Sequence, residues 1–308
     1  MAGKAVPATR SLWVGYGLAA TGAFLFSTKS IFIKLAYAEG VDPETLLALR
    51  MVMSLPFYLV IGLLGVRSDP VRSRHVLGDR RAVASAVLIG LLGYWFSSYA
   101  DFKGLLYISA GFERLILFTY PLFVVLLGAM FFGQRVRVRA LMAFGISYCG
   151  LAVIFVQDFA EIGTAALVGV AWVMVAAVAY ALYQLLAHRM IAGMGARLFT
   201  CIAMSAACVA AILQYLLLHP IEPVSERVLW LGLLLAIAAT VLPSFFMNAA
   251  LSRISAQANA TIATISPVAT LALAVLVLGD SLTVIDVAGS TLVLAGIGFF
   301  TLMSRSRA

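Results

Sequence analysis

Ten apolar runs, each about as long as one membrane crossing, account for nearly all of this 308-residue chain. The hydrocarbon core of a bilayer is about 30 Å thick, so a helix needs about 20 apolar residues to cross it. Hydrophobic residues make up 63% of the chain and charged residues 11%, which leaves no room for a separate water-soluble domain. The sequence therefore predicts an all-α polytopic membrane protein with ten transmembrane helices, at residues 12–36, 44–65, 81–100, 104–132, 137–156, 165–190, 196–218, 227–250, 255–278 and 283–303.

Basic residues gather in alternate breaks between these runs. Fifteen of the 21 lysine and arginine residues lie at the chain ends and in every second break, whereas the other breaks collect acids such as Glu39 and Asp42. Short loops rich in Lys and Arg mark the cytoplasmic side, so both termini are expected there. These loops, including the charged break at 66–81, explain the net charge of +8, and no nucleic-acid partner is expected. The run at 12–36 is too long for the apolar region of a signal peptide, so we expect it to be a retained first span.

The two halves of the chain resemble each other at a constant offset of 146 residues. The stretch ISAGFERLILFTYP at 108–121 corresponds to ISAQANATIATISP at 254–267, and Gly133 and Gly150 correspond to Gly279 and Gly296. Each half holds five expected spans, an odd number, so the second repeat should be inverted relative to the first. Inverted repeats are typical of secondary transporters, whose substrate site lies near the midplane. We therefore expect two repeats, at residues 1–156 and 165–303, that form one transport domain.

These repeated pieces resemble the drug/metabolite transporter superfamily, of the EamA-domain type. The resemblance rests on ISAGFERLILFTYPLFVVLLGAMFFGQ and RISAQANATIATISPVATLALAVLVLGD, and it covers essentially the whole chain. The family usually has Glu after the glycine that closes the fourth helix, whereas this chain has Gln134 and Asp280 there. In style the chain is most similar to bacterial aromatic amino acid exporters. The resemblance implies export of small molecules across a bacterial cytoplasmic (inner) membrane, with no obligate protein partner.

Polar and aromatic side chains inside the spans are the candidates for lining a path. Trp and Tyr near span ends can instead anchor the protein at the membrane interface, and His188 can be a residue of the cytoplasmic edge. The two prolines can act as hinges or as mere packing kinks. The cavity candidates are Lys29, Tyr94, Trp95, Tyr99, Trp172, Tyr180, Tyr183, Gln184, Ser244 and Asn248, and the coupling or gating candidates are Glu113, Pro121, Pro267 and His188.

Three charged residues inside the spans need a physical explanation. A lysine at membrane depth costs at least about 2.5 kcal/mol unless it reaches water or a partner. Lys29 could therefore extend to the outer surface, or it could border a water-filled cavity, attracting a carboxylate or pairing with Glu113. Adjacent helical residues point about 100 degrees apart, so Glu113 and Arg114 should not pair ideally, one facing inward and the other extending outward. Glu113 is read as the only acid inside the membrane, hence the sole carboxylate candidate for proton coupling.

The function that the sequence favours most is export of small metabolites by alternating access. Amino acids, including aromatic ones, are the favoured substrates. Aromatic side chains can pack against rings, while amides and hydroxyls bind zwitterionic groups. A nucleotide-sugar or drug-like amine transporter and a lipid-linked substrate flippase remain alternatives. An enzyme is not expected, because the spans contain no nucleophile with a base, no metal-ligand cluster and no acid pair. No cofactor or metal is expected, and Cys149, Cys201 and Cys208 are read as small buried apolar residues. The expected partners are a small amino-acid-like substrate and membrane lipids.

Overall fold

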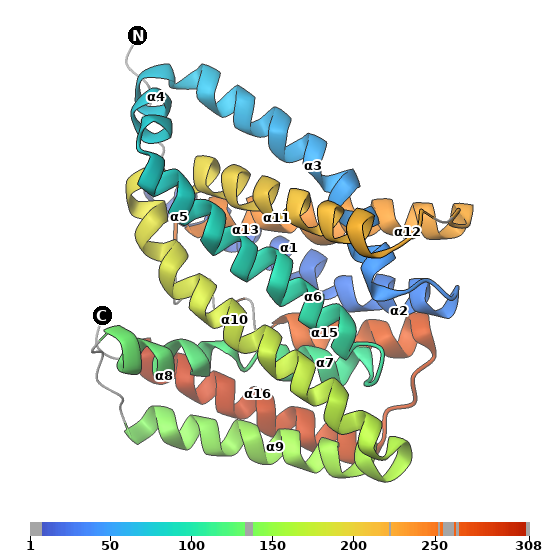
Figure 1. Cartoon of the computed structure of the whole chain (residues 1–308). Helices are drawn as coiled ribbons and strands as arrows, with labels where there is room; N and C mark the ends of the chain where they lie inside the picture. Colours follow the sequence, from blue (N-terminus) through green and yellow to red (C-terminus); the bar gives the residue numbers. More distant parts are fainter. Residues whose placement is uncertain are drawn as a thin grey trace.

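The computed structural model describes residues 8–132, 138–221, 223–251, 253, 254, 262 and 265–305. All regular secondary structure in these residues is helical (Figure 1). The α-helices are α1 (Ala8–Ser27), α2 (Lys29–Ala38), α3 (Pro43–Ser68), α4 (Pro70–Gly78), α5 (Arg80–Gly90), α6 (Ser97–Gly104), α7 (Ala110–Leu117), α8 (Tyr120–Phe132), α9 (Val138–Ile162), α10 (Thr164–Met194), α11 (Ala196–Leu218), α12 (Glu226–Ala236), α13 (Leu242–Leu251), α15 (Ile265–Leu273) and α16 (Val284–Arg305). Three π-helical segments lie between them, η1 (Leu91–Phe96), η2 (Ile237–Val241) and η3 (Ala274–Leu278).

Seven helical stretches of the described chain are long and apolar enough to cross a membrane. They are Leu12–Ala38, Pro43–Ser68, Arg80–Gly104, Ala110–Phe131, Thr164–Ile191, Ala196–Leu218 and Glu226–Met247. The prediction of an all-α polytopic membrane protein is confirmed by this pattern, whereas ten crossings and the inversion of the repeats stay predictions.

The first expected span corresponds to the candidate span Leu12–Ala38, within which a turn at Thr28 separates α1 from α2. Two details of the sequence-based segmentation are wrong. The break at 66–81 contains the helix α4, because Asp69 ends α3 and Pro70 can begin a new helix. The expected fourth span starts not at residue 104 but at Ala110, where Ser109 caps α7 by accepting a hydrogen bond from the backbone N–H of Phe112 (3.1 Å).

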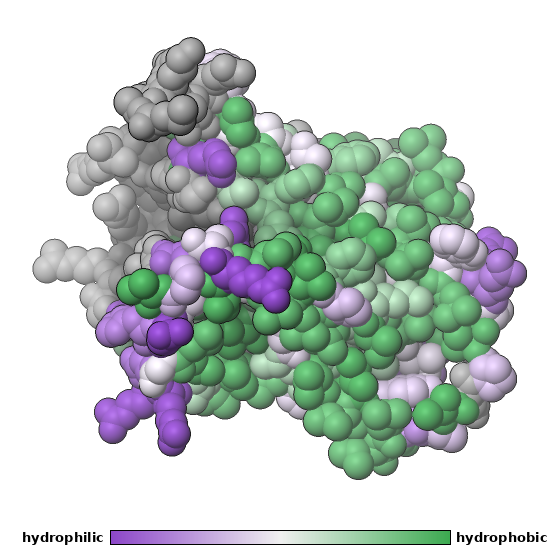
Figure 2. All heavy atoms as spheres, turned by 90° about the horizontal axis from the view of Figure 1, so that it is seen from above, coloured by the Kyte–Doolittle hydropathy of each residue, from purple (hydrophilic) through white to green (hydrophobic). Residues whose placement is uncertain are grey.

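The surface of the protein carries a broad apolar belt. Figure 2 shows hydrophobic residues across the middle of the visible face and hydrophilic residues gathered at two opposite ends. The exposed side chains include large apolar ones. Leu217 is 81% exposed and Leu276 is 80% exposed. An apolar belt on helices of membrane-spanning length fits a surface that faces lipid.

Chain segments far apart in sequence meet at these two ends. A Cβ atom on Gly65 would lie 3.0 Å from Cδ of Arg197, so the end of α3 and the start of α11 are neighbours. At the opposite end of α3, Arg227 forms an ion pair with Glu39 (3.0 Å). The basic breaks after α3 and before α11 thus share one end, and the acidic break after α2 lies at the other.

The interruption between α1 and α2 exposes backbone carbonyls that other helices satisfy. Helix ends leave carbonyl groups without partners inside the helix. Here the carbonyl of Phe26 accepts a hydrogen bond from Nη2 of Arg114 (3.3 Å), and that of Ser27 accepts one from Oγ1 of Thr270 (2.9 Å). The break at Thr28 places Lys29 and Ser30 at the start of α2, deep inside the protein.

A second interruption separates α7 from α8 at Phe118 and Thr119. The hydroxyl of Thr119 donates to the carbonyl of Ile116 (2.7 Å), which closes the last turn of α7. Proline has no backbone N–H, so the chain cannot continue a regular helix through Pro121, although the first turn of a helix accepts it. Pro121 is accordingly the second residue of α8.

Two π-helical segments occur at the spacing of the sequence repeat. The segment η1 begins at Leu91 and η2 at Ile237, a separation of 146 residues. π-Helical turns are rare and are frequent at functional sites. Their occurrence at matched positions indicates that the similarity between the two halves extends from sequence to local backbone geometry.

Small residues allow the closest helix contacts. A Cβ atom on Gly93 of η1 would lie 2.3 Å from the ring of Tyr183 in α10, and one on Gly150 of α9 would lie 2.5 Å from the carbonyl oxygen of Gly289 in α16. These contacts leave no space for a larger side chain.

Candidate functional site

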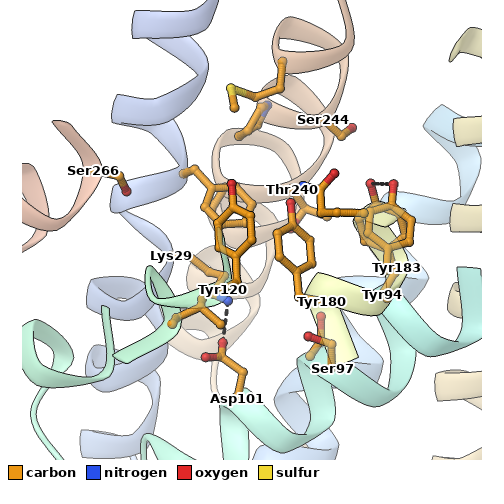
Figure 3. A pocket seen from close by; sticks show the side chains of 18 of the residues that line it. Lys29, Tyr94, Ser97, Asp101, Tyr120, Tyr180, Tyr183, Thr240, Ser244 and Ser266 are labelled. Atoms are coloured by element: carbon orange, nitrogen blue, oxygen red, sulfur yellow. Dashed lines mark hydrogen bonds and ion pairs between the residues drawn. The ribbon is translucent and has the colours of Figure 1, made fainter. Parts of the chain in front are cut away.

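A central cavity lies between helices of both halves of the chain. About 140 Å³ of its space is open to the centres of water molecules, enough for several waters or a small metabolite. Figure 3 shows side chains converging on it from segments far apart in sequence. Among the side chains that line it are six cavity candidates from the sequence, namely Lys29, Tyr94, Tyr180, Tyr183, Gln184 and Ser244.

Four tyrosines form an aromatic wall in this cavity. The hydroxyl groups of Tyr94 and Tyr183 are hydrogen-bonded (2.8 Å). The ring of Tyr180 stacks on that of Tyr183, with centroids 5.5 Å apart, and meets the ring of Tyr120 edge-on at 5.0 Å. Such an arrangement offers apolar ring faces for packing together with hydroxyl groups for hydrogen bonding.

A buried ion pair lies at another part of the cavity. Lys29, the first residue of α2, pairs with Asp101 of α6 (Figure 3), and both side chains are almost completely buried. The expectation that Lys29 pairs with Glu113 or extends to the surface is therefore wrong. Asp101, which falls in the expected break between the spans at 81–100 and 104–132, is instead buried because α6 packs against α10.

Glu113 and Arg114 are both fully buried, with 0% exposure each. The expectation that one of them extends outward is wrong. Oε2 of Glu113 accepts a hydrogen bond from the hydroxyl of Ser30 (2.5 Å), and Ser30 accepts one from Nη2 of Arg114 (2.6 Å). The distance from Nε of Arg114 to Oε2 of Glu113 is 3.9 Å. This is long for an ion pair, as expected from the 100-degree offset between adjacent helical residues. Arg114 faces inward because it also caps the end of α1.

The carboxyl groups of Asp101 and Glu113 are both buried and interact electrostatically with each other. Each also has one buried oxygen without a donor among the described residues, Oδ1 of Asp101 and Oε1 of Glu113. Asp101 lies within the candidate span Arg80–Gly104, so the interpretation of Glu113 as the only acid within the spans is wrong.

Arg50 of α3 is a buried cation that lines the cavity. Its Nη2 donates to the hydroxyl of Ser98 (3.0 Å), and its Cζ lies 5.0 Å from the centroid of the Phe102 ring. No hydrogen-bond partner for its buried Nε lies in the described part of the chain.

Three cavity candidates are not among the lining side chains. Trp95 donates through Nε1 to Oε1 of Gln214 (2.6 Å). The rings of Tyr99 and Trp172 meet edge-on with centroids 6.0 Å apart, and the hydroxyl of Tyr99 donates to Glu44 (3.3 Å).

Four candidates remain, and the structure describes the side chain of one of them. Pro267 is buried in α15, next to the cavity-lining Ser266. The side chains of Asn248, Pro121 and His188 lie outside the described residues.

Several lining residues are absent from the sequence-based selection. Arg50, Asp101, Tyr120 and Ser266 all line the cavity. Arg50 carries the same signal as Lys29, a charge inside an apolar run, and could have been selected on that basis. Asp101 gives no such signal, because the surrounding segment SSYADFKG is polar enough to resemble a break between spans.

The possible metal ligands and the three cysteines are the next group of side chains. No group of three or more His, Cys, Asp or Glu side chains among them could hold a metal ion. Cys201 and Cys208 are buried, as expected, whereas Cys149 is exposed, contrary to the expectation for a buried apolar residue.

Comparisons with known proteins agree with the membrane architecture. The profile of the family described as "EamA-like transporter family" matches residues 13–156 and again residues 167–302. The "Uncharacterized transporter YcbK" of Bacillus subtilis (strain 168) is 28% identical over 274 residues, which cover 87% of this chain and 86% of that protein. A solved structure described only as "Crystal structure of protein" has a TM-score of 0.66 at 20% identity, covers 97% of this chain and 98% of its own, and supports the fold alone. Because the family profile matches twice and covers most of the chain, this protein belongs to the EamA-like transporter family of the drug/metabolite transporter superfamily.

Proposed function

We propose that this protein exports small metabolites, most simply amino acids including aromatic ones, by alternating access through the central cavity. The observation that carries the proposal is the combination of an aromatic wall and buried charges in one cavity, between helices of both repeats. Tyrosine rings suit an apolar or aromatic side chain, and charged groups suit the ends of a zwitterion.

The proposed architecture has ten crossings in two inverted repeats, with both termini in the cytoplasm of a bacterial cell. The matched positions of η1 and η2 support a duplicated unit, and an odd number of crossings in each unit requires the inversion. The gathering of basic breaks at one end supports a cytoplasmic assignment of that end.

We propose that the cavity opens toward this basic end. In support, its lining residues on α10 extend from Tyr180 to Ile191, about 17 Å of helix toward the start of α11. At the opposite end, Lys103 of α6 pairs with Glu44 of α3 (2.6 Å), and the Lys29–Asp101 pair joins α2 to α6. An exporter in this state loads substrate from the cytoplasm, and opening to the outside would require these helices to separate.

The acid pair of Glu113 and Asp101 is the proposed site of proton coupling. A proton shared by the two carboxyl groups would be released or bound when the Lys29–Asp101 pair opens, since Asp101 takes part in both interactions. Pro121 at the start of α8 and Pro267 in α15 are the proposed hinges, because each lies where a regular helix is interrupted or begins.

The test is flux through purified protein in liposomes of defined lipid composition. Amino acids, nucleotide sugars, cationic drugs and a labelled lipid are each offered with and without a pH gradient. Amino acid flux above that of protein-free liposomes supports the proposal, and flux limited to another class assigns the protein to that class instead.

A further inference from the structure

The buried charges of the described residues do not balance. Three cations are buried, Lys29, Arg50 and Arg114, against two acids, Asp101 and Glu113. Asp101 pairs with Lys29, and Glu113 is connected to Arg114 through Ser30. Arg50 is left without an acidic partner within 4.0 Å in the described chain. Asp101 attracts Arg50 only from beyond that distance. A buried charge that no counter-charge contacts is unfavourable, so this position favours an anion from outside the protein.

The environment of Arg50 holds its guanidinium group in a fixed orientation. One edge donates to Ser98, and one face lies against the ring of Phe102. Nε remains without a partner, at a residue that is 3% exposed and lines the cavity. A guanidinium group presents pairs of parallel N–H donors, which match the two oxygens of a carboxylate.

We infer that Arg50 binds the carboxylate group of the transported metabolite. This inference rests on the proposed function and narrows its substrate class to carboxylates with an apolar or aromatic side chain. Lys29 is less suited to the role, because its ammonium group is already paired with Asp101.

The position of the aromatic wall fits such a substrate. Tyr94 precedes Ser98, the partner of Arg50, by four residues in one continuous helical stretch, which corresponds to about 6 Å along the axis. A carboxylate at Arg50 thus places an attached ring within reach of the cluster formed by Tyr94, Tyr180 and Tyr183. An amine that lacks the carboxylate would bring a positive charge toward Arg50 and Lys29, so it should bind poorly.

Three related compounds separate the carboxylate from the rest of the substrate. L-Phenylalanine has both charged groups, phenethylamine lacks the carboxylate, and 3-phenylpropanoate lacks the ammonium group. Wild-type protein in liposomes should take up labelled phenylalanine, and 3-phenylpropanoate should compete with it at least 10-fold better than phenethylamine. Arg50→Gln should weaken the apparent affinity for phenylalanine by about 10- to 100-fold. Arg50→Lys keeps the charge but loses the paired donors. Its apparent affinity for phenylalanine should lie between that of the wild type and that of Arg50→Gln.

The matched control is Arg227→Gln, the same substitution in an exposed ion pair. It should leave the affinity unchanged. Equal competition by phenethylamine and 3-phenylpropanoate in the wild type would overturn the inference, and this comparison needs no variant to fold. So would an Arg50→Gln protein with wild-type affinity. If the wild type shows neither phenylalanine flux nor a shift of its Tm on addition of phenylalanine, both the proposed function and this inference are contradicted. Flux that is independent of Arg50 would contradict the inference alone.

Discussion

Lys29 and Asp101, 72 residues apart in sequence, form a buried ion pair that joins the first residue of α2 to the middle of α6. The break in helical structure at Thr28 makes this pairing possible, since it starts a new helix inside the protein. The ion pair, the acid pair and the Arg114 cap of α1 together form one charged cluster beside the cavity.

Replacing Asp101 by Asn should strongly destabilise the protein. The change leaves Lys29 as a buried charge without its partner, and breaking a buried pair in this way costs about 3–5 kcal/mol. We expect a clear fall in the Tm of the purified protein in detergent. Arg227→Gln breaks an exposed pair, worth about 0–1 kcal/mol, and serves as the control. Equal Tm values for the two variants would contradict the structural role of the Lys29–Asp101 pair.

Replacing Glu113 by Gln should abolish the dependence of flux on pH. The amide cannot release or bind the proton that we propose for the acid pair, so the proposed transport cycle loses its proton-dependent step. Flux in liposomes is measured from pH 5.5 to pH 8.5, with the Tm recorded at each pH to separate transport from folding. A variant whose flux still follows pH like the wild type would remove Glu113 from the coupling site.

Replacing Gly93 by Ala should disturb the contact between η1 and α10. The added Cβ would lie 2.3 Å from the ring of Tyr183, and forcing extra atoms into such a site costs about 1–3 kcal/mol. Gly17→Ala in α1 has no atom within 4 Å of the added Cβ and should be neutral or slightly stabilising. We expect a lower Tm and lower flux for the first variant only, and unchanged values for Gly93→Ala would show that the helices can move apart freely.

Replacing Tyr180 by Ala should reduce transport of aromatic amino acids more than that of alanine. The substitution removes the ring that contacts both Tyr183 and Tyr120 in the cavity wall. Initial rates for phenylalanine and alanine are compared with those of Tyr16→Ala, which changes an exposed tyrosine near the start of α1 whose ring meets that of Trp13 edge-on. An equal loss for both substrates would indicate that Tyr180 supports the fold rather than substrate choice.

The membrane class follows from the sequence, because long apolar runs are a local property that composition reveals. The charges at Lys29, Glu113 and Arg114 stand out for the same reason, since each interrupts such a run. Their partners could not be predicted in this way. Ser30 connects Glu113 to Arg114 only because α2 lies against α7, and that contact is a property of the tertiary fold.

The helix interruptions illustrate a second limit of the sequence. Pro121 signals the start of α8, because proline lacks an N–H group. The break at Thr28 has no proline or glycine within FLFSTKSIF, and it depends on Arg114 and Thr270 from other helices to bind the free carbonyls. The same limit applies to Asp101, whose polar neighbours resemble a loop although α6 is buried against α10.

The central claim is that substrate crosses the membrane through the cavity lined by the tyrosine wall. The most direct measurement is counterflow of labelled phenylalanine in liposomes containing Ser244→Trp, which fills the cavity, or Leu276→Trp, which places the same side chain on the exposed surface. We predict that Ser244→Trp loses most of the counterflow and that Leu276→Trp keeps it, at comparable Tm and protein content. Wild-type counterflow by a folded Ser244→Trp protein would contradict the account.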